Sequence, residues 1–221
     1  MCFSATASFS ASVIIGGIGI ATMKAKHHKS QNIFASIPFL FSIQQFCEGF
    51  IWLSFKNPQF QSLQTPFTSF FLVFAWAIWP IMLPFAMYQM EENPHKKAII
   101  KTLFIAGIII GITSIYSIIF NKPQAYIASF HIDYRLLDTS KTKMIMALDS
   151  LFYVVCTILP MLISSVKNIR IFALVNILAL ILSFTFYKQA LPSTWCFFAA
   201  ILSGCIYWLL TTQKAKSQFQ H

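Results

Sequence analysis

Residues 44–52 read Gln-Gln-Phe-Cys-Glu-Gly-Phe-Ile-Trp and lie inside an apolar run from Gln31 to Phe55. That run is long enough to cross a lipid bilayer as a helix. Glu48 is the only acidic residue in it, and a carboxylate in hydrocarbon costs about 2.5–3.5 kcal/mol on insertion scales. Polar side chains on one face of a membrane helix are expected to point into a helix bundle. Helical spacing gathers four such side chains into one stripe: Gln44, Gln45, Glu48 and Trp52.

The composition is that of a multi-pass membrane protein. Hydrophobic residues make up 57% of the 221, charged residues only 10%, and phenylalanine alone contributes 24. A composition so apolar and so poor in charge lies outside the range of soluble domains. The net charge of +10 does not indicate a nucleic-acid partner, because the basic residues stand in short clusters between apolar runs. The five cysteines form no CxxC pair, so neither a disulfide framework nor a structural zinc site is implied.

Seven apolar segments follow one another, each about as long as a membrane-spanning helix. They are Ser4–Met23, Gln31–Phe55, Pro66–Met90, Ala98–Phe120, Met144–Ser164, Ile169–Tyr187 and Thr194–Thr212. With the N-terminus outside, ten Lys and Arg residues face the cytoplasm and six face outward, as the positive-inside rule favours. We therefore predict an all-α integral membrane protein with seven transmembrane helices, N-terminus out and C-terminus in. Residues 1–212 would form the transmembrane domain and residues 213–221 a polar cytoplasmic tail.

Small residues and prolines predict how these helices pack. Small residues at helical spacing let backbones approach closely, so we expect such strips to contact neighbouring helices. The strips are Ser4, Ser8, Ser12 and Gly16 in the first segment, Gly107 and Gly111 in the fourth, and Ala200 and Gly204 in the seventh. Prolines within the segments are expected to kink the helices and free backbone carbonyls. These are Pro38, Pro80, Pro84 and Pro160.

The predicted topology brings ionisable and reactive groups to one depth, in the outer halves of the helices. The connection from Asn121 to Lys143, long enough to be a lid or binding loop, lies on the same side. The candidate catalytic residues are Glu48, His131 and Asp149. The pocket around them would be formed by Cys2, Ser4, Gln44, Gln45, Trp52, Asp133, Tyr134, Tyr153, Trp195 and Cys196.

Each of these residues also has a simpler interpretation. Glu48 also has an explanation as a structural carboxyl bonded to a neighbouring helix, although intramembrane acids are more often functional, and Asp149 as an interfacial residue near the start of its helix. A lone loop histidine such as His131 is weak evidence for a ligand. Cysteines are most simply small apolar packing residues, and Trp52 and Trp195 fit an aromatic belt as well as a pocket wall.

The chain resembles an uncharacterised family of small bacterial multi-pass membrane proteins. The likeness includes the opening Met1-Cys2-Phe3-Ser4-Ala5 and the pattern Gln-Gln-x-x-Glu-Gly-x-x-Trp beginning at Gln44. It extends to His131 and Tyr134 as a His-x-x-Tyr, and to a Trp-Cys-x-x-Ala-Ala beginning at Trp195. The resemblance implies an integral protein of the bacterial cytoplasmic membrane and implies no activity.

Three functions remain open. In the first, the protein is an enzyme acting on a membrane lipid or another amphipathic small molecule, with Glu48 as general base or metal ligand. The metal candidates are then Glu48, His131, Asp133 and Asp149, which suit a divalent ion such as zinc. In the second, it is a transporter that binds a proton or cation at Glu48 and Asp149. In the third, it is a membrane sensor or binding protein without turnover.

Overall fold

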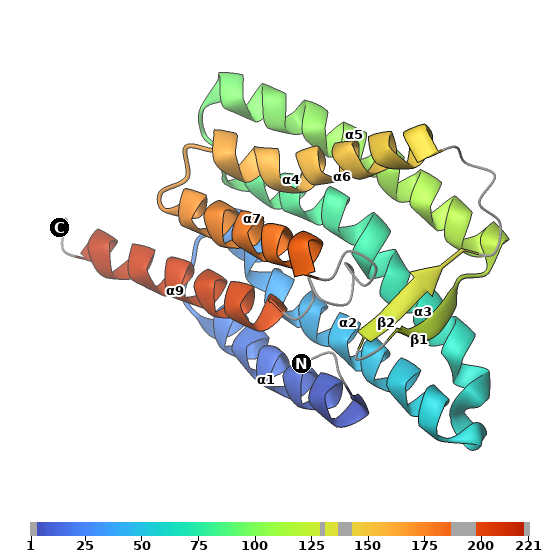
Figure 1. The fold of residues 1–221 in the computed structure, drawn as a ribbon. Helices are drawn as coiled ribbons and strands as arrows, with labels where there is room; N and C mark the ends of the chain where they lie inside the picture. Colours follow the sequence, from blue (N-terminus) through green and yellow to red (C-terminus); the bar gives the residue numbers. More distant parts are fainter. Residues whose placement is uncertain (1–3, 129–130, 137–142, 187–197, 219–221) are drawn as a thin grey trace.

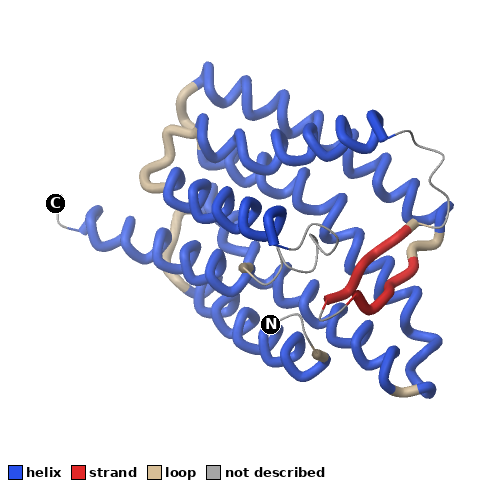
Figure 2. The backbone as a smooth tube through the Cα atoms, viewed as in Figure 1, coloured by secondary structure: helices blue, strands red, loops and turns tan. Residues whose placement is uncertain are grey.

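The computed structural model describes residues 4–128, 131–136, 143–186 and 198–218. In this part of the chain the protein is a bundle of long helices with one small β-hairpin at one end (Figures 1 and 2). The helices are α1 (Ala5–Lys24), α2 (Asn32–Lys56), α3 (Gln64–Leu72), α4 (Trp79–Met90), α5 (Pro94–Asn121), α6 (Lys143–Ile163), α7 (Ile169–Phe186) and α9 (Ala199–Gln218). Two 3₁₀ turns, η1 (Lys29–Gln31) and η2 (Pro58–Leu63), precede α2 and α3.

A π-helical turn, η3 (Val73–Ile78), joins α3 directly to α4, so the described chain has seven long helical segments. Pro80 explains the turn, because proline has no N–H to donate to the carbonyl four residues earlier. Upstream, the Trp79 N–H bonds to Phe74 O, five residues back. The Ala75 carbonyl of this turn accepts a hydrogen bond of 2.6 Å from the Tyr153 hydroxyl of α6. The sequence predicted that Pro80 would free a backbone carbonyl, and a neighbouring helix donates to one in this turn.

Small residues bring α1 and α2 together as the sequence predicted. The Ser12 and Ser42 hydroxyls each donate to the other residue's carbonyl, at 2.9 and 2.8 Å. A Cβ added at Gly16 would lie 2.9 Å from Ser42 Oγ, and one at Gly19 would lie 2.9 Å from Phe39 N. This contact is therefore close enough to require small residues.

The glycines of α5 lie against a neighbouring helical segment, whereas Gly204 of α9 does not. A Cβ at Gly107 would lie 1.9 Å from Pro80 O and one at Gly111 would lie 2.6 Å from Ile81 Cδ1, so α5 packs closely on η3 and α4. Nothing lies within 4 Å of the corresponding position at Gly204. The expected contact at Gly204 was therefore wrong, since helical spacing of small residues cannot show which face meets a neighbour.

Four helical segments are long and apolar enough to cross a membrane, by length and composition. They are Ala5–Lys24, Pro58–Met90, Pro94–Asn121 and Ile169–Phe186. Two shorter apolar helical stretches, Leu148–Ile163 and Ala199–Thr212, accompany them among the described residues. The 25-residue helix α2 is not in this group. Its polar stripe, with two glutamines and a glutamate, lowers its hydropathy.

The long connection after α5 is not a plain loop. It folds into a hairpin in which β1 (Gln124–Ala128) pairs antiparallel with β2 (His131–Arg135). The register places Ala125 opposite Tyr134 and Tyr126 opposite Asp133. We call the end of the bundle that carries the strands the hairpin end; α1, α3, α6 and α9 begin there (Figure 1). The other end, where α4 is followed by Glu91, is called the Glu91 end.

Candidate functional site

The stripe on α2 is buried inside the bundle. Gln44, Gln45, Glu48 and Trp52 are all shielded from solvent, and Glu48 is 0% exposed. Glu48 lies two turns before the end of α2 at Lys56, which is roughly 12 Å along the helix axis. The sequence therefore predicted correctly that this face points inward.

Tyr134 of β2 is the hairpin residue that contacts Glu48. Its hydroxyl donates to Glu48 Oε1 at 3.4 Å, and its ring stacks on Phe71 of α3 with centroids 4.7 Å apart. Side chains alternate along a strand, so Ile132 and Tyr134 face the bundle together, and both are buried. The hairpin thus lies over the Glu48 region and supplies it with a hydroxyl group.

A second hydrogen bond anchors the stripe to the third helical segment. The indole Nε1 of Trp79 donates to Gln44 Oε1 at 2.9 Å, and both side chains are buried. Phe41 packs against the same indole, with ring centroids 4.2 Å apart. Trp79 begins α4 directly after the π-helical turn. Gln44 therefore holds α2 in register with the point where that segment changes its helical geometry.

Buried polar atoms without a hydrogen-bond partner gather at the hairpin end. In the described part of the chain these are Ser8 Oγ, Trp52 Nε1, Thr68 Oγ1, Ser183 Oγ and Ser203 Oγ. We call them the five unpaired groups. Each lies within about one and a half turns of the described end of its helix on the hairpin side. Leaving a buried donor unsatisfied costs about 1–3 kcal/mol, so these side chains are the candidates at this end for binding a polar group.

The Glu91 end is satisfied by the protein itself. Glu91 is buried, and its carboxylate accepts from Asn93 N at 3.0 Å, from the Ser164 hydroxyl at 2.9 Å and from Ser165 N at 2.6 Å. Burial alone would raise the pKa of Glu91, but these hydrogen bonds outweigh it and hold the pKa below its ordinary value. The network ties the turn between α4 and α5 to the turn between α6 and α7. Sequence reasoning missed it, although an acidic residue just before the Asn93-Pro94 helix start was a usable signal.

His131 and Asp133 lie on the other face of β2 from Tyr134, because they alternate with it along the strand. Asp133 forms an ion pair of 2.7 Å with Arg135, whose guanidinium lies 5.3 Å from the Tyr126 ring centroid. Burial lowers the pKa of His131, which favours the neutral imidazole. The hairpin residue bonded to Glu48 is thus Tyr134, whereas we had expected His131 to close over that carboxyl.

The remaining described candidates, Asp149, Tyr153 and Ser4, have other surroundings. Asp149 is exposed near the start of α6, and Tyr153, one turn further on, is engaged with the Ala75 carbonyl. Ser4 caps α1, its hydroxyl accepting from Ala7 N at 3.2 Å. Cys2, Trp195 and Cys196 lie outside the described residues.

The metal candidates do not come together. No group of three or more His, Cys, Asp or Glu side chains that could hold a metal ion occurs among the described residues. Glu48, His131, Asp133 and Asp149 all belong to that part of the chain. They therefore do not form a shared ligand set, and one reason is that His131 and Asp133 lie on the face of β2 opposite to Tyr134, the residue that contacts Glu48.

Fold and site define an all-α protein with several membrane-length apolar helices and a buried polar cluster at one end. The chain belongs to a family of unknown function, DUF6629, whose sequence model matches residues 1–220. No curated protein and no solved structure matches it.

Proposed function

We propose that this protein is a seven-span membrane protein, N-terminus outside, with an outward-facing polar pocket centred on Glu48 that acts on a lipid or another amphipathic substrate. One observation carries the proposal: the five unpaired groups all lie at the hairpin end, where Glu48 is also buried. Polar groups buried between lipid-facing helices are expensive, so they mark functional sites.

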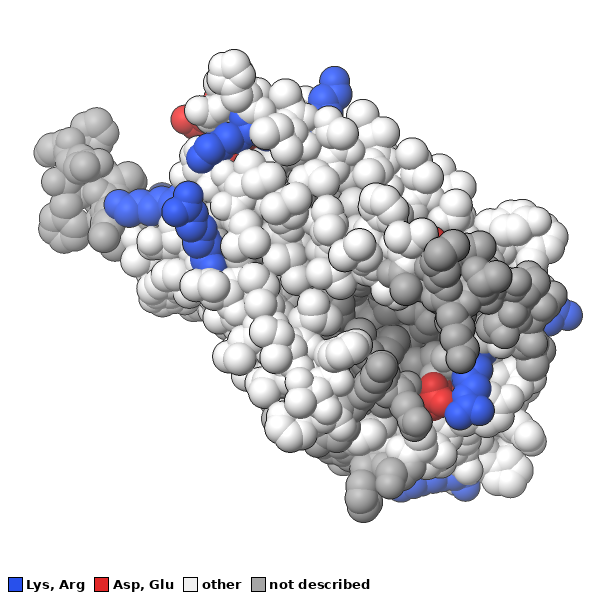
Figure 3. All heavy atoms as spheres, turned by 45° about the horizontal axis from the view of Figure 1, so that its top comes forward, with Lys and Arg blue, Asp and Glu red and all other residues white. Residues whose placement is uncertain are grey.

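The charge distribution supports the orientation. The clusters Lys24, Lys26, Lys29 and Lys96, Lys97, Lys101 belong to the Glu91 end, together with Lys167 and Arg170. The described cations of the hairpin end are Lys56, Lys122, Arg135 and Lys143. On the face drawn in Figure 3 the charged side chains lie towards the two ends, with uncharged surface between them. The positive-inside rule then assigns the Glu91 end to the cytoplasm.

In this pocket Glu48 is the group that exchanges a proton with the substrate. Tyr134 donates to its Oε1 and so orients the carboxyl, which can abstract a proton as a general base. The hydroxyls of Ser8 and Thr68 and the indole N–H of Trp52 can donate to the oxygens of a bound headgroup. The hairpin limits the access of water from outside.

Glu48→Gln tests the proposal. The amide keeps the shape and can still accept from Tyr134, but it cannot serve as a base, so we expect a folded protein that has lost activity. Purified wild type, Glu48→Gln and the matched control Glu92→Gln, an exposed carboxyl, are each incubated with a bacterial total-lipid extract. Mass spectrometry then follows lipid conversion and co-purified lipid. We expect wild type and the control to agree and Glu48→Gln to differ. Identical lipid profiles for all three would refute the assignment.

A transporter is the second candidate, favoured by the π-helical turn. Broken helices near the middle of the membrane are typical of transporter binding sites, and η3 interrupts a 33-residue segment. A transporter also needs a polar path to the other side, whereas the buried Glu91 carboxylate at that end is bonded to Asn93, Ser164 and Ser165. If wild type carries protons into proteoliposomes, Glu48→Gln does not, and neither protein converts lipid, the transporter is favoured over the enzyme.

A further inference from the structure

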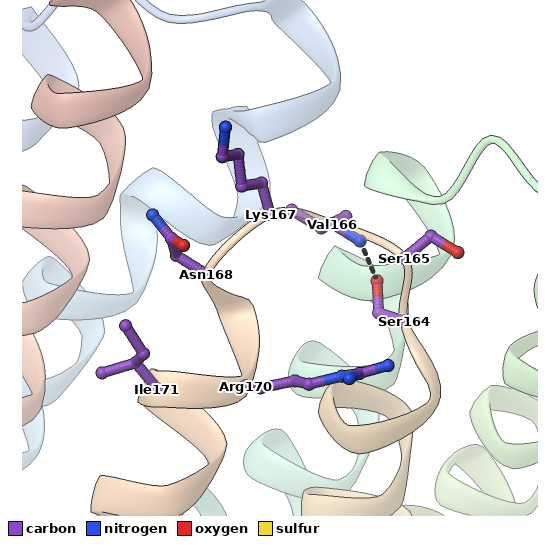
Figure 4. Close-up of a pocket in the computed structure, with 7 residues that line it drawn as sticks. All are labelled: Ser164, Ser165, Val166, Lys167, Asn168, Arg170 and Ile171. Carbon is purple, nitrogen blue, oxygen red and sulfur yellow. Dashed lines mark hydrogen bonds between the residues drawn. The ribbon is translucent and has the colours of Figure 1, made fainter. Parts of the chain in front are cut away.

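A pocket lies at the Glu91 end, on the turn that joins α6 to α7. It has a volume of about 410 Å³, within the range of roughly 300–1,000 Å³ typical of small-molecule sites. Its lining comes from a single stretch, Ser164 to Ile171, and includes Ser165, Lys167 and Arg170 (Figure 4). It is separate from Glu48 and its surroundings, because Glu48 lies towards the hairpin end of the helices and this pocket lies at the Glu91 end.

The pocket is cationic. Lys167 and Arg170 are exposed members of its lining, and Figure 4 shows their side chains extending to different sides of the turn. A third cation, Lys96 of α5, donates from Nζ to Ser165 Oγ at 2.8 Å. The nearest buried acid, Glu91, is already occupied by Ser164 and Ser165 N, and Glu92 beside it is exposed. Lys96, Lys167 and Arg170 thus outnumber the two described acids of this region, Glu91 and Glu92, and the excess positive charge favours an anion.

The backbone of the turn adds to this preference. Asn168 has φ of 62°, in the left-handed region that asparagine tolerates better than most residues. The sharp reversal lets α7 begin at Ile169, immediately beside the pocket. The start of a helix carries a partial positive charge. The N–H groups of Ile169 and Ile171 are bonded to the carbonyls of Val166 and Asn168, so the donors that suit the paired oxygens of a phosphate come from the Arg170 guanidinium.

An apolar stripe leads away from the pocket along α7. Ile171 lines the pocket and is exposed, and Leu174 and Leu178 follow at helical spacing with exposed fractions of 61% and 55%. A free inorganic anion makes no apolar contacts with such a stripe, whereas the acyl chain of a lipid can pack along it. We propose that the pocket binds the phosphodiester headgroup of an anionic phospholipid, with the acyl chains against this stripe.

This inference rests on the proposed membrane insertion but not on the role of Glu48. At the cytoplasmic face, where the positive-inside rule places this end, anionic lipids attract basic residues by about 1 kcal/mol for each Lys or Arg. Removing two cations should then weaken binding about 30-fold, which corresponds to about 2 kcal/mol at 1.4 kcal/mol per factor of ten.

The test uses the full chain in detergent and the double variant Lys167→Gln/Arg170→Gln. The matched control is Lys24→Gln/Lys29→Gln, which removes the same charge from exposed positions at the same end but outside the pocket. Phosphatidylglycerol is titrated against each protein, with phosphatidylcholine as the neutral lipid. Native mass spectrometry counts bound lipid and the melting temperature reports stabilisation. If the double variant does not fold, Arg170→Lys takes its place, because lysine keeps the positive charge but lacks the paired N–H donors of the guanidinium.

We expect phosphatidylglycerol to bind and stabilise wild type and control alike, with affinity for the pocket variant about 30-fold lower and Arg170→Lys intermediate. Equal loss in the control would show general charge attraction and would overturn the site. Equal stabilisation by inorganic phosphate would overturn the lipid assignment, because the acyl chains would then add nothing. Since Glu48 is intact in all these proteins, failure here is distinct from failure of the Glu48 proposal.

Discussion

Adding a single methyl group at Gly107 should separate two helices. A Cβ at this position would lie 1.9 Å from the carbonyl oxygen of Pro80 and 2.8 Å from its carbon, and real Cβ atoms essentially never come within 3.0 Å of another heavy atom. The obstructing atoms are backbone, so no side-chain rotation relieves the overlap. The only response to Gly107→Ala is for α5 to move about 1 Å away from η3 and α4.

The size of the effect follows from two opposing contributions. Overpacking a tight interface costs about 1–3 kcal/mol. Alanine in a helix interior is itself favoured over glycine by up to about 1 kcal/mol. Gly17 of α1 isolates the second contribution, because nothing lies within 4 Å of its added Cβ. We therefore expect Gly17→Ala to be neutral or stabilising and Gly107→Ala to be less stable than it by about 1–3 kcal/mol.

Thermal unfolding in detergent, followed by tryptophan fluorescence, measures the difference. For a chain of this length 1 kcal/mol corresponds to about 2–4 °C in melting temperature, so the two variants should differ by several degrees. The loss should also appear in Gly107→Ser, which is similar in size. Equal melting temperatures for Gly107→Ala and Gly17→Ala would refute the close approach of α5 to Pro80.

Two further predictions concern hydrogen bonds. Because the pKa of Glu91 is lowered in the folded state, its contribution to stability is present above the ordinary carboxyl pKa of about 4.3 and is lost as the pH falls through the folded value. Glu91→Gln should therefore be less stable than wild type at pH 7 and lose less stability between about pH 5 and 3; parallel pH curves would contradict this. Tyr153→Phe should leave the Ala75 carbonyl without its donor and destabilise the fold by about 1–2 kcal/mol, whereas Tyr116→Phe, an exposed tyrosine on α5, should not. If the two variants melt alike, the bond at the π-helical turn contributes nothing measurable.

The order and approximate bounds of most helices could be predicted because each helix corresponds to a local apolar run in the sequence. Asn121, the predicted start of the long connection, is the last residue of α5, and Lys143, its predicted end, is the first of α6. The inward face of Glu48 also followed from spacing alone. The hairpin was missed because its strands have five residues each, and so short a stretch gives little periodicity. Alternation between Ile132 and Tyr134 was the signal available.

Partnerships between helices could not be predicted. The bonds from Trp79 to Gln44 and from Tyr153 to Ala75 join residues 35 and 78 positions apart. Periodicity tells which face of a helix is buried but not which helix it meets. For the same reason the candidate site was only partly predicted. Glu48 is buried in the second half of its helix, as spacing predicted, while the hydroxyl that reaches it from the connection belongs to Tyr134.

The π-helical turn also determines which way the two halves of its segment face. A π turn amounts to one extra residue within an α-helix, and each residue turns an α-helix by about 100°. Deleting one residue between Val73 and Ile78 would restore regular winding and rotate α3 by about that angle relative to α4. Phe71 would then point away from the Tyr134 ring on which it stacks, while Trp79 kept its bond to Gln44. The π-helical turn thus rotates the second half of this continuous segment relative to the first. As a result α3 faces the hairpin, while α4 faces the α5–α6 side of the bundle.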